Sequence, residues 1–221
     1  MTDGLIPPHA SEHDAALLRR AYTIRDPKDG QELYAEWAET YDTTMVTGLG
    51  YVVPTVFADR FAAVVPWRDR RTLDVGCGTG LVGVELSKRG FEQLDGVDLS
   101  EAMLAQAEQR QVYERLAVAD LTMPLAIDDC SYEAVVCTGT FTSGHVTAEC
   151  LDELLRVLRV GGFLAASVHE AVWQTSGFAD AFDRLQQAGR VELIEMTAVP
   201  FYASSPIADG RICIFRRLMS I

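Results

Sequence analysis

The spacing of apolar residues divides the chain into two parts near residue 70. Up to that point, apolar residues recur at the spacing of three and four that is typical of amphipathic helices. We expect helices over 12–22, 31–42 and 55–65, with Ser11 capping the first and Pro54 opening the third. The segments "DPKDG" and "TGLGYVVP" are expected to separate these helices.

Beyond residue 70, short apolar runs alternate with helical patterns. The segments expected as strands are "TLDV", "QLDGVDLS", "RLAVADL", "YEAVVCTG", "FLAASVHE", "RVELIEMTAVPFY" and "RICIFRRLMSI". Helices are expected between them over 79–90, 101–110, 145–162 and 178–189. The last two strands are expected to form an antiparallel pair. This alternation predicts an α/β protein with a doubly wound, mainly parallel sheet and helices on both faces.

A chain of 221 residues is expected to form one compact domain. Within it we expect an N-terminal helical extension, or cap, over 1–70 and an α/β core over 71–221. Ligands of such sheets bind outside the carboxyl ends of the strands, at the point where the strand order reverses. The functional site is therefore expected at that edge of the sheet.

The charge and cysteine content narrow the classes of partner. The formal net charge is −13, which argues against a nucleic-acid partner because such proteins usually present a basic face. The five cysteines include no CxxC pair, so neither a disulfide framework nor a metal site is expected, and a cytoplasmic location fits best. No run of about 18 apolar residues suggests a membrane span, and no secretory signal is expected.

The stretch "LDVGCGTG", residues 73–80, follows the first expected strand and precedes a helix. Asp98 closes the next strand 20 residues after Gly78, where a carboxylate can accept hydrogen bonds from a ribose. Dinucleotide sites usually carry GxGxxG, whereas the glycines here are Gly76, Gly78 and Gly80. No lysine or arginine lies between Gly76 and Ser87 to pair with a phosphate. The alternative is that the glycines only permit tight packing of strand and helix.

This glycine pattern resembles the first motif of class I S-adenosylmethionine-dependent methyltransferases, which have a Rossmann-like fold. The segments "GVDLS", "VADL", "AVVCTGTF" and "ELLRVLRVGGFLAAS" resemble later motifs of the same family. Three longer pieces, "YAEWAETYD", "DVGCGTGLVGVELSKRGFEQLDGVDLSEAML" and "FDRLQQAG", resemble the subgroup of methyltransferase-like proteins known from the Williams-Beuren syndrome region. The resemblance runs from about residue 34 to residue 192, and it implies a seven-stranded sheet with a reversed last strand.

The resemblance also implies that the cofactor is S-adenosyl-L-methionine and that S-adenosyl-L-homocysteine is a product. The residues that it places at the amino-acid end of the cofactor are Tyr34, Tyr41, Asp74, Gly76, Cys77, Gly78, Gly80 and Cys137. The residues that it places at the ribose and adenine are Asp98, Leu99, Met103, Asp120 and Leu121. Within this set, Tyr41 is expected over the carboxylate, and Asp74 near the ammonium group.

Two histidines are candidates for a general base. His145 and His169 follow the fourth and fifth expected strands, where either could take a proton from an acceptor hydroxyl or amine. The alternative for each is a solvated loop histidine or a cap of the following helix. Trp37 is expected in the core because aromatics at helical spacing usually pack there. Cys77 is not expected to be a nucleophile, since no histidine lies near it in the sequence.

These features together predict a methyltransferase that acts on an oxygen, nitrogen or carbon of a small-molecule acceptor. We expect no metal, membrane or nucleic-acid partner, and a monomer or a homodimer. Methylation of nucleic-acid bases is disfavoured because residues 137–140, "CTGT", replace the Asn/Asp-Pro-Pro-aromatic motif of amino-methylating enzymes. Methylation of a protein stays open, and so do two other classes, an NAD(P)-dependent oxidoreductase and a protein that binds S-adenosylmethionine without catalysis.

Overall fold

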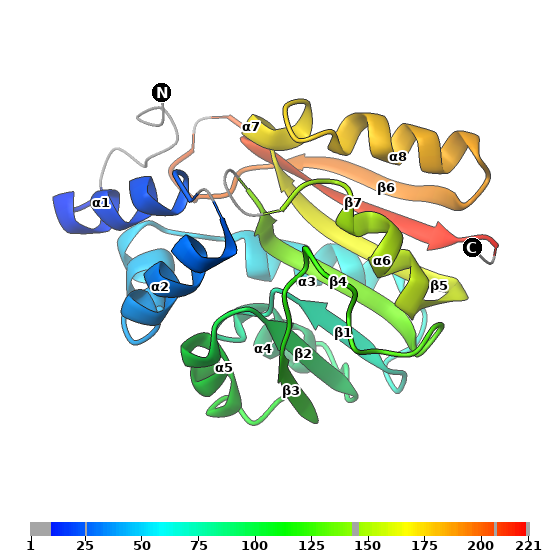
Figure 1. Ribbon diagram of the computed structural model, residues 1–221, viewed down its shortest axis with the longest axis horizontal. Coiled ribbons are helices and arrows are strands. Elements are labelled where there is room, and N and C mark those ends of the chain that lie inside the picture. Colours follow the sequence, from blue (N-terminus) through cyan, green and yellow to red (C-terminus); the bar gives the residue numbers. More distant parts are fainter. Residues whose placement is uncertain (1–9, 25, 143–145, 206, 220–221) are drawn as a thin grey trace.

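Seven strands form a single sheet in the computed structural model, which describes residues 10–24, 26–142, 146–205 and 207–219 (Figure 1). The strand order is β3-β2-β1-β4-β5-β7-β6. The strands are β1 (Thr72–Val75), β2 (Leu94–Asp98), β3 (Arg115–Val118), β4 (Tyr132–Phe141), β5 (Leu158–His169), β6 (Val191–Val199) and β7 (Gly210–Arg217). This confirms the expected seven-stranded α/β fold.

The sheet is parallel except at β7, which runs antiparallel to both β5 and β6. Strand β1 lies between β2 and β4, so the chain first builds outward to β3 and then continues on the other side of β1. The carboxyl ends of β1 and β4 consequently flank the switch in strand order. This is the position at which a doubly wound sheet leaves a crevice for a ligand.

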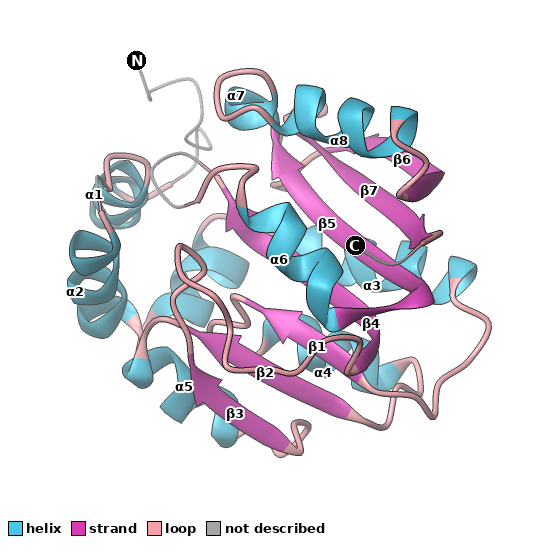
Figure 2. Ribbon diagram, turned by 45° about the vertical axis from the view of Figure 1, so that its right-hand side comes forward, coloured by secondary structure: helices cyan, strands magenta, loops and turns pink. Residues whose placement is uncertain are grey.

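Helices cover both faces of the sheet (Figure 2). They are α1 (Glu12–Ala21), α2 (Pro27–Trp37), α3 (Val53–Val64), α4 (Leu81–Lys88), α5 (Glu101–Glu108), α6 (Cys150–Val157), α7 (Glu170–Trp173) and α8 (Phe178–Gln187), with a π-helix, η2 (Thr43–Gly48). Ala134 and Val136 of β4 join the core formed with α3 and α4, whereas Val135 and Cys137 join the core formed with α6 and α8. The period of two along β4 therefore feeds two separate hydrophobic cores.

The N-terminal helices occupy two different places. Helix α3 packs against α4 and against β4 and β5, with Phe57 and Phe61 fully buried in the core of that face. Helices α1 and α2 lie beside the carboxyl ends of the strands instead, at the left of Figure 1. We call α1, α2 and η2 the cap helices, because residues that they carry or that adjoin them line the pocket described below.

Several element boundaries differ from the expected ones. Helix α2 begins at Pro27, with the Asp26 side chain accepting a hydrogen bond from the Asp29 amide, so "DPKDG" starts the helix rather than breaking it. Residues 43–48 form η2, which was not expected and whose last two residues fall in the expected break "TGLGYVVP". Helix α6 ends at Val157 because Leu158 pairs with Tyr132 of β4, so β5 begins earlier than expected. The short helix α7 was not expected.

Candidate active site

A pocket lies at the carboxyl ends of β1 to β4 and beneath the cap helices. It encloses about 1090 Å³ of space, part of which is open to solvent. The predicted cofactor residues that line it are Tyr34, Tyr41, Asp74, Gly76, Cys77, Gly78, Asp98, Leu99, Met103, Asp120 and Leu121. Gly80 and Cys137 do not line it. The structure thus brings eleven residues from distant parts of the chain to one cavity.

The glycine loop is fastened to the end of β2 by backbone hydrogen bonds. The amides of Gly76 and Cys77 donate to the Val97 carbonyl at 2.8 and 3.0 Å, and the Gly78 amide donates to the Asp98 carboxylate at 2.9 Å. Gly78 has a φ of +54°, and a Cβ added there would meet no atom within 4 Å. This left-handed backbone conformation favours glycine at position 78, and its bare face borders open space in the pocket.

Asp98 ends β2 with its carboxylate held by the backbone. Its second oxygen accepts a hydrogen bond from the Ser100 amide at 2.9 Å. Burial raises the pKa of Asp98, and the amides of Ser100, Gly78 and Leu99 act against that rise by stabilising the charged form. Because each carboxylate oxygen has two acceptor positions, the group keeps capacity for the two hydroxyls of a ribose.

Asp74 is the third residue of β1, a strand that is buried along its whole length, and 1% of its surface is accessible. Burial, with a contribution from the negative charge of Asp98, raises the pKa of Asp74 to about 7. The Tyr113 hydroxyl donates a hydrogen bond to Asp74 Oδ2 at 2.7 Å, which acts against that rise. This is a carboxylate at the pocket wall that a cationic ligand group would stabilise.

Two predicted residues support the site without lining it. Gly80 is the residue before α4, with a φ of +86°, and an added Cβ would press on Tyr113 and Arg110. Cys137 points into the core formed with α6 and α8, while Thr138 and Thr140 next to it line the pocket. The alternation of β4 thus turns the Cys137 side chain away, and its backbone neighbourhood is what borders the cavity.

The wall formed by Met103, Asp120 and Leu121 is largely apolar, and its carboxylate accepts hydrogen bonds from a neighbouring residue. Met103 lies in the first turn of α5, which Ser100 caps by accepting from the Met103 amide. Asp120 accepts hydrogen bonds from the amide and the hydroxyl of Thr122 at 2.8 and 2.7 Å. Leu121 lines the same wall. This wall therefore combines apolar side chains with one carboxylate.

Cys77 and Trp37 have the surroundings of structural residues. Burial raises the pKa of the Cys77 thiol well above its usual value, so the unreactive thiol is the populated form. Trp37 is 1% exposed and packs edge-on against Tyr41, with ring centroids 4.8 Å apart. The expectation that Trp37 belongs to the core is confirmed, and its neighbours Tyr34 and Tyr41 are the ring residues of this segment that line the pocket.

Asp42 joins the cap helices to the glycine loop, a role that the sequence analysis missed. Its carboxylate accepts a hydrogen bond from the Thr79 hydroxyl at 2.5 Å and forms an ion pair with Arg110. Thr79 lies between Gly78 and Gly80, so the contact spans 37 residues of sequence. Asp42 ends the segment "YAEWAETYD", which the sequence analysis did single out, but only the fold brings its side chain to Thr79.

The two candidate histidines differ in what the structure says of them. His145 lies outside the described residues. His169 is 1% exposed, does not line the pocket, and accepts a hydrogen bond at Nδ1 from the Ala171 amide at 3.1 Å, which caps α7. Burial lowers the pKa of His169, so its neutral form is favoured. The helix-capping alternative describes this contact, and a catalytic role for either histidine stays a prediction.

Tyr51 is a pocket residue that the sequence analysis did not select. It forms a β-bridge with Tyr202, and the neighbouring Val52 amide donates to the Phe201 carbonyl at 2.9 Å. Its hydroxyl lies 3.0 Å from where a Cβ would stand on Gly139, at the end of β4. Thr138 beside it has a buried hydroxyl with no hydrogen-bond partner among the described residues. These two hydroxyls offer polar contacts on the part of the pocket wall near the end of β4.

Comparisons with known proteins point to one family. A family model for a methyltransferase domain matches residues 73–166, which include the glycine loop, Asp98 and the end of β4. Methyltransferase-like protein 27 of Homo sapiens is 36% identical over 183 residues, covering 80% of this chain and 74% of the human protein. The chain belongs to the S-adenosylmethionine-dependent methyltransferases. This confirms the family, the enzyme class and the cofactor that the motifs implied.

Two further relatives of this methyltransferase extend the comparison. Ribosomal RNA small subunit methyltransferase G of Acidothermus cellulolyticus is 28% identical over 206 residues, covering 86% of each chain. A TehB-like SAM-dependent methyltransferase from Corynebacterium glutamicum has a similar structure, with a TM-score of 0.63 over 83% of this chain and 97% of that one, at 21% identity. The second likeness supports the fold.

The pocket of this methyltransferase fits S-adenosylmethionine on its own chemistry. Gly78 leaves a bare backbone where the amino-acid end would approach, and Asp98 keeps acceptor positions for a ribose. Asp74 offers a carboxylate whose ionised form a neighbouring cation stabilises. In the described part of the chain there is no cluster of three or more side chains arranged to hold a metal ion. No helix there is long and apolar enough to cross a membrane.

Proposed function

We propose that this methyltransferase transfers a methyl group to an oxygen, nitrogen or carbon atom of a small molecule that carries no strong negative charge. The observation that carries the proposal is the charge of the pocket. The titratable side chains among its described lining residues include the carboxylates Asp26, Asp74, Asp98 and Asp120 but no lysine, arginine or histidine. Such a lining favours cationic and neutral acceptors and disfavours polyanions such as a phosphate backbone.

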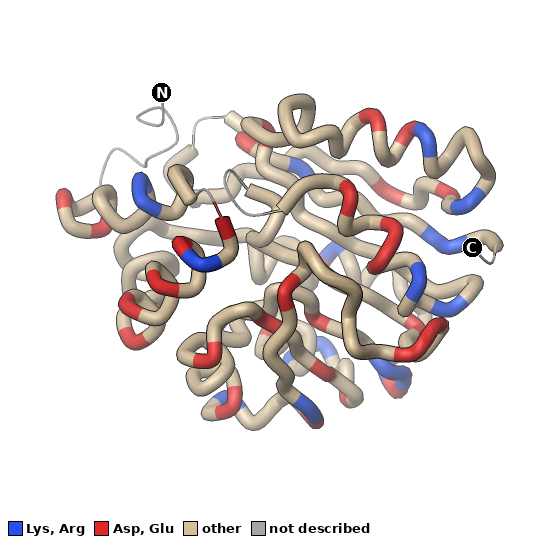
Figure 3. Tube along the Cα trace, in the orientation of Figure 1, with Lys and Arg blue, Asp and Glu red and all other residues tan. Residues whose placement is uncertain are grey.

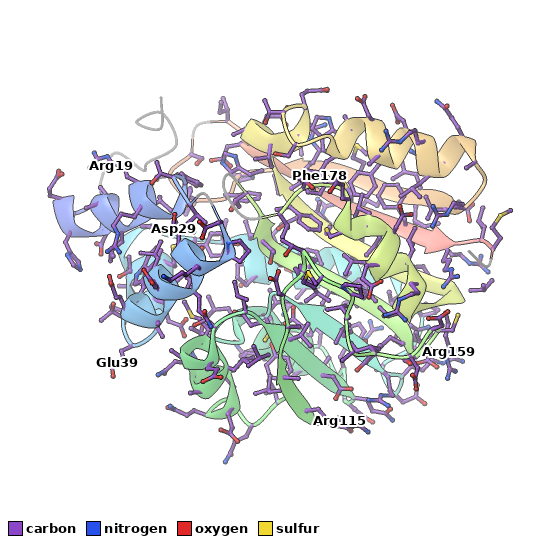
Figure 4. The ribbon with its side chains drawn as sticks, in the orientation of Figure 1. Arg19, Asp29, Glu39, Arg115, Arg159 and Phe178 are labelled. Atoms are coloured by element: carbon purple, nitrogen blue, oxygen red, sulfur yellow. The ribbon has the colours of Figure 1, made fainter. Side chains whose placement is uncertain are left out.

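The distribution of basic residues supports the same conclusion. Lys and Arg are dispersed along the chain, and several gather at the end of the sheet opposite the cap helices (Figure 3). Arg71, Arg115 and Arg159 lie at the amino ends of parallel strands, and Arg115 and Arg159 reach the periphery in Figure 4. A nucleic acid that delivered a base to the pocket would need cations around the pocket itself. The cations Arg110 and Lys28 beside the pocket are paired with Asp42 and Glu32, so the placement favours an acceptor without a phosphate backbone.

The cap-side wall supports a small, partly apolar acceptor. Tyr41 and Tyr51 line this wall, and burial raises the pKa of both, so their hydroxyls are neutral. Tyr51 and Thr138 lie near the end of β4, where the family resemblance places the reacting sulfur. The cofactor brings an activated methyl group, so the protein has chiefly to align the acceptor and exclude water. We place the acceptor between Tyr51 and the end of β4.

Within the cofactor half of the pocket we propose the following roles. Asp98 binds the ribose hydroxyls, and Asp74 receives the ammonium group. Tyr41 covers the amino-acid carboxylate, with Tyr34 beside it. Met103, Leu121 and Asp120 enclose the adenine. In each case the support is the position of the side chain in the pocket and the matching family motif.

One relative favours a second candidate function. Ribosomal RNA small subunit methyltransferase G matches 86% of the chain, and its name states an RNA substrate. Its identity of 28% leaves the acceptor side free to differ. RNA methylation is therefore the alternative against which the small-molecule proposal is tested. A cytoplasmic location and a monomeric or homodimeric state stay predictions.

A two-pool labelling experiment tests the proposal. The purified protein is incubated with methyl-labelled S-adenosylmethionine and either a nucleic-acid-free small-molecule extract or deproteinised ribosomal RNA. We expect label in a small molecule from the extract, no label in the RNA, and no transfer by the Asp98→Ala variant. Label that enters RNA and becomes soluble after ribonuclease treatment would overturn the proposal in favour of the alternative.

A further inference from the structure

A partly buried tyrosine that no family motif selected contacts a pocket residue from the side away from the cavity. Tyr113 lies between α5 and β3, and its ring runs beneath the glycine loop toward β1. Its hydroxyl donates a hydrogen bond of 2.7 Å to Asp74 Oδ2, across 39 residues of sequence. The partner of this hydrogen bond, Asp74, lines the pocket, whereas Tyr113 itself does not. Tyr113 can therefore act on a ligand only through Asp74.

Three glycines make room for this tyrosine. A Cβ added to Gly83 in the first turn of α4 would collide with the Tyr113 hydroxyl and its ring carbon Cζ. Additions at Gly80 and Gly96 would approach the two edges of the ring, at 3.1 and 3.2 Å. Tight packing is thus the reason for Gly83, which sits outside the loop that borders the pocket. The sequence keeps space for a side chain whose polar end meets Asp74.

No cationic side chain among the described residues is found beside Asp74, and its side-chain hydrogen-bond donor is Tyr113. The other titratable groups that influence it or feel its charge are Asp98, Cys77 and Cys137. None of these carries a positive charge, and burial and Asp98 both favour the protonated form of Asp74. Among the described residues, Asp74 accepts a side-chain hydrogen bond from Tyr113 alone.

We propose that Tyr113 is a positioning residue for cofactor binding: its hydroxyl holds the Asp74 carboxylate in place and in its ionised form, ready for the ammonium group of the cofactor. The inference rests on the role proposed for Asp74 above. A tyrosine hydroxyl can serve here because it donates a hydrogen bond without adding a charge that would repel the ammonium. An arginine or lysine in its place would compete with the ligand for the carboxylate.

A pH dependence follows from this arrangement. Burial raises the pKa of Asp74 to about 7, so part of the free protein carries a protonated Asp74 at neutral pH. Binding of an ammonium group favours the ionised form, so affinity rises with pH until Asp74 is ionised in the free protein. Loss of the Tyr113 hydroxyl raises the pKa of Asp74 further. The resulting loss of affinity is largest near neutral pH and shrinks at higher pH.

Calorimetric titration of Tyr113→Phe tests the proposal with two ligands. S-adenosylhomocysteine carries the ammonium group, and 5′-methylthioadenosine shares its adenosine and sulfur but lacks the amino-acid portion. We expect S-adenosylhomocysteine to bind about tenfold more weakly to the variant near pH 7, with the loss falling to about threefold near pH 8.5. Binding of 5′-methylthioadenosine should change less than about twofold at either pH.

Asp74→Asn serves as the matched variant, since asparagine can still accept the Tyr113 hydrogen bond but does not ionise. We expect it to remove the pH dependence assigned to Asp74, and Tyr113→Phe to weaken its binding no further. An equal loss for both ligands, or a loss that is constant with pH, would show that Tyr113 only packs beneath the loop. Failure of the unaltered protein to bind S-adenosylhomocysteine would instead refute the assigned cofactor site.

Discussion

The two halves of the pocket are built in different ways. The strand-end half consists of the glycine loop, Asp74 and Asp98, all fixed by backbone hydrogen bonds to adjacent parallel strands. The cap half consists of tyrosines on helices and loops, joined by contacts such as the β-bridge between Tyr51 and Tyr202. The first half is the one to which we assign the cofactor shared by the family, and the second can change with little cost to the sheet.

This difference has a physical origin in what each half depends on. Strand ends are placed by a continuous ladder, so a shift of one residue would disturb the cores on both faces. The cap helices depend on a few long-range contacts, among them the hydrogen bond from Thr79 to Asp42. Substitutions that compare the two halves should therefore affect cofactor affinity strongly at the strand ends and weakly in the cap.

The largest effect is expected at Asp98. Asp98→Ala removes the acceptor for two ribose hydroxyls and frees the Gly78 amide, so S-adenosylhomocysteine should bind at least about 100-fold more weakly. Isothermal calorimetry measures this, and Asp183→Ala on the exposed face of α8 is the control. An affinity within about threefold of the unaltered protein would mean that the strand-end half does not hold the ribose.

The next effect concerns stability and comes from Asp74. Burial raises the pKa of Asp74 to about 7, above that of an unfolded aspartate. Between about pH 4 and about pH 7 the folded state therefore holds a proton that the unfolded state has released. Unfolding free energy should therefore fall by about 2 kcal/mol as pH rises from about 5 to about 7, and flatten above that range. Denaturant unfolding of the protein and of Asp74→Asn checks this. A difference between the two that does not vary with pH would contradict it.

A smaller effect is expected where the halves meet. Asp42→Ala removes the acceptor for the buried Thr79 hydroxyl and the partner of the partly exposed Arg110, and should weaken S-adenosylhomocysteine binding about fivefold. Amide hydrogen exchange in η2 should accelerate at the same time. Thr79→Val removes the same hydrogen bond from the other side and should give a similar change. Unaltered exchange in both variants would argue that the cap is held by packing alone.

The smallest effect is expected deep in the cap half. The hydroxyls of Tyr22 and Tyr202 lie 3.3 Å apart and are buried, but Tyr22 does not line the pocket. Tyr22→Phe should lower the unfolding free energy by about 0.5–1 kcal/mol and leave S-adenosylhomocysteine affinity unchanged. A double-mutant cycle with Tyr202→Phe measures the coupling. A marked loss of cofactor affinity in Tyr22→Phe would contradict the claim that the cap half contributes little to cofactor binding.

The sequence predicted most of the strand-end half because its signals are local. The glycines, Asp98 and the expected strands occur at fixed spacing, and each was placed in or beside the pocket by the fold. Cys137 marks the limit of such reading, because the pleat of β4 turns its side chain into the core. The motif identified a stretch of backbone that borders the pocket, but it did not say which of its side chains faces the cavity.

The rest required three-dimensional contacts. Tyr113 meets Asp74, and Asp42 meets Thr79, only because helices and strands fold over one another. The start of α2 was missed although Asp26 and Pro27 form a recognisable helix start, because the whole segment "DPKDG" is also typical of a break between helices. No periodicity distinguishes the π-helical turns of η2 from a loop. Residues whose roles depend on a distant partner are those that a single sequence hides.

The charge of the pocket has a consequence for the end of each reaction cycle. A lining rich in carboxylates attracts the sulfonium ion of S-adenosylmethionine more strongly than the uncharged thioether of S-adenosylhomocysteine. The same electrostatic field that favours binding of the reactant therefore binds the product less tightly. Loss of the sulfonium charge on methyl transfer then promotes product release without a conformational change. High ionic strength, which screens this field, should narrow the difference in affinity between the two forms.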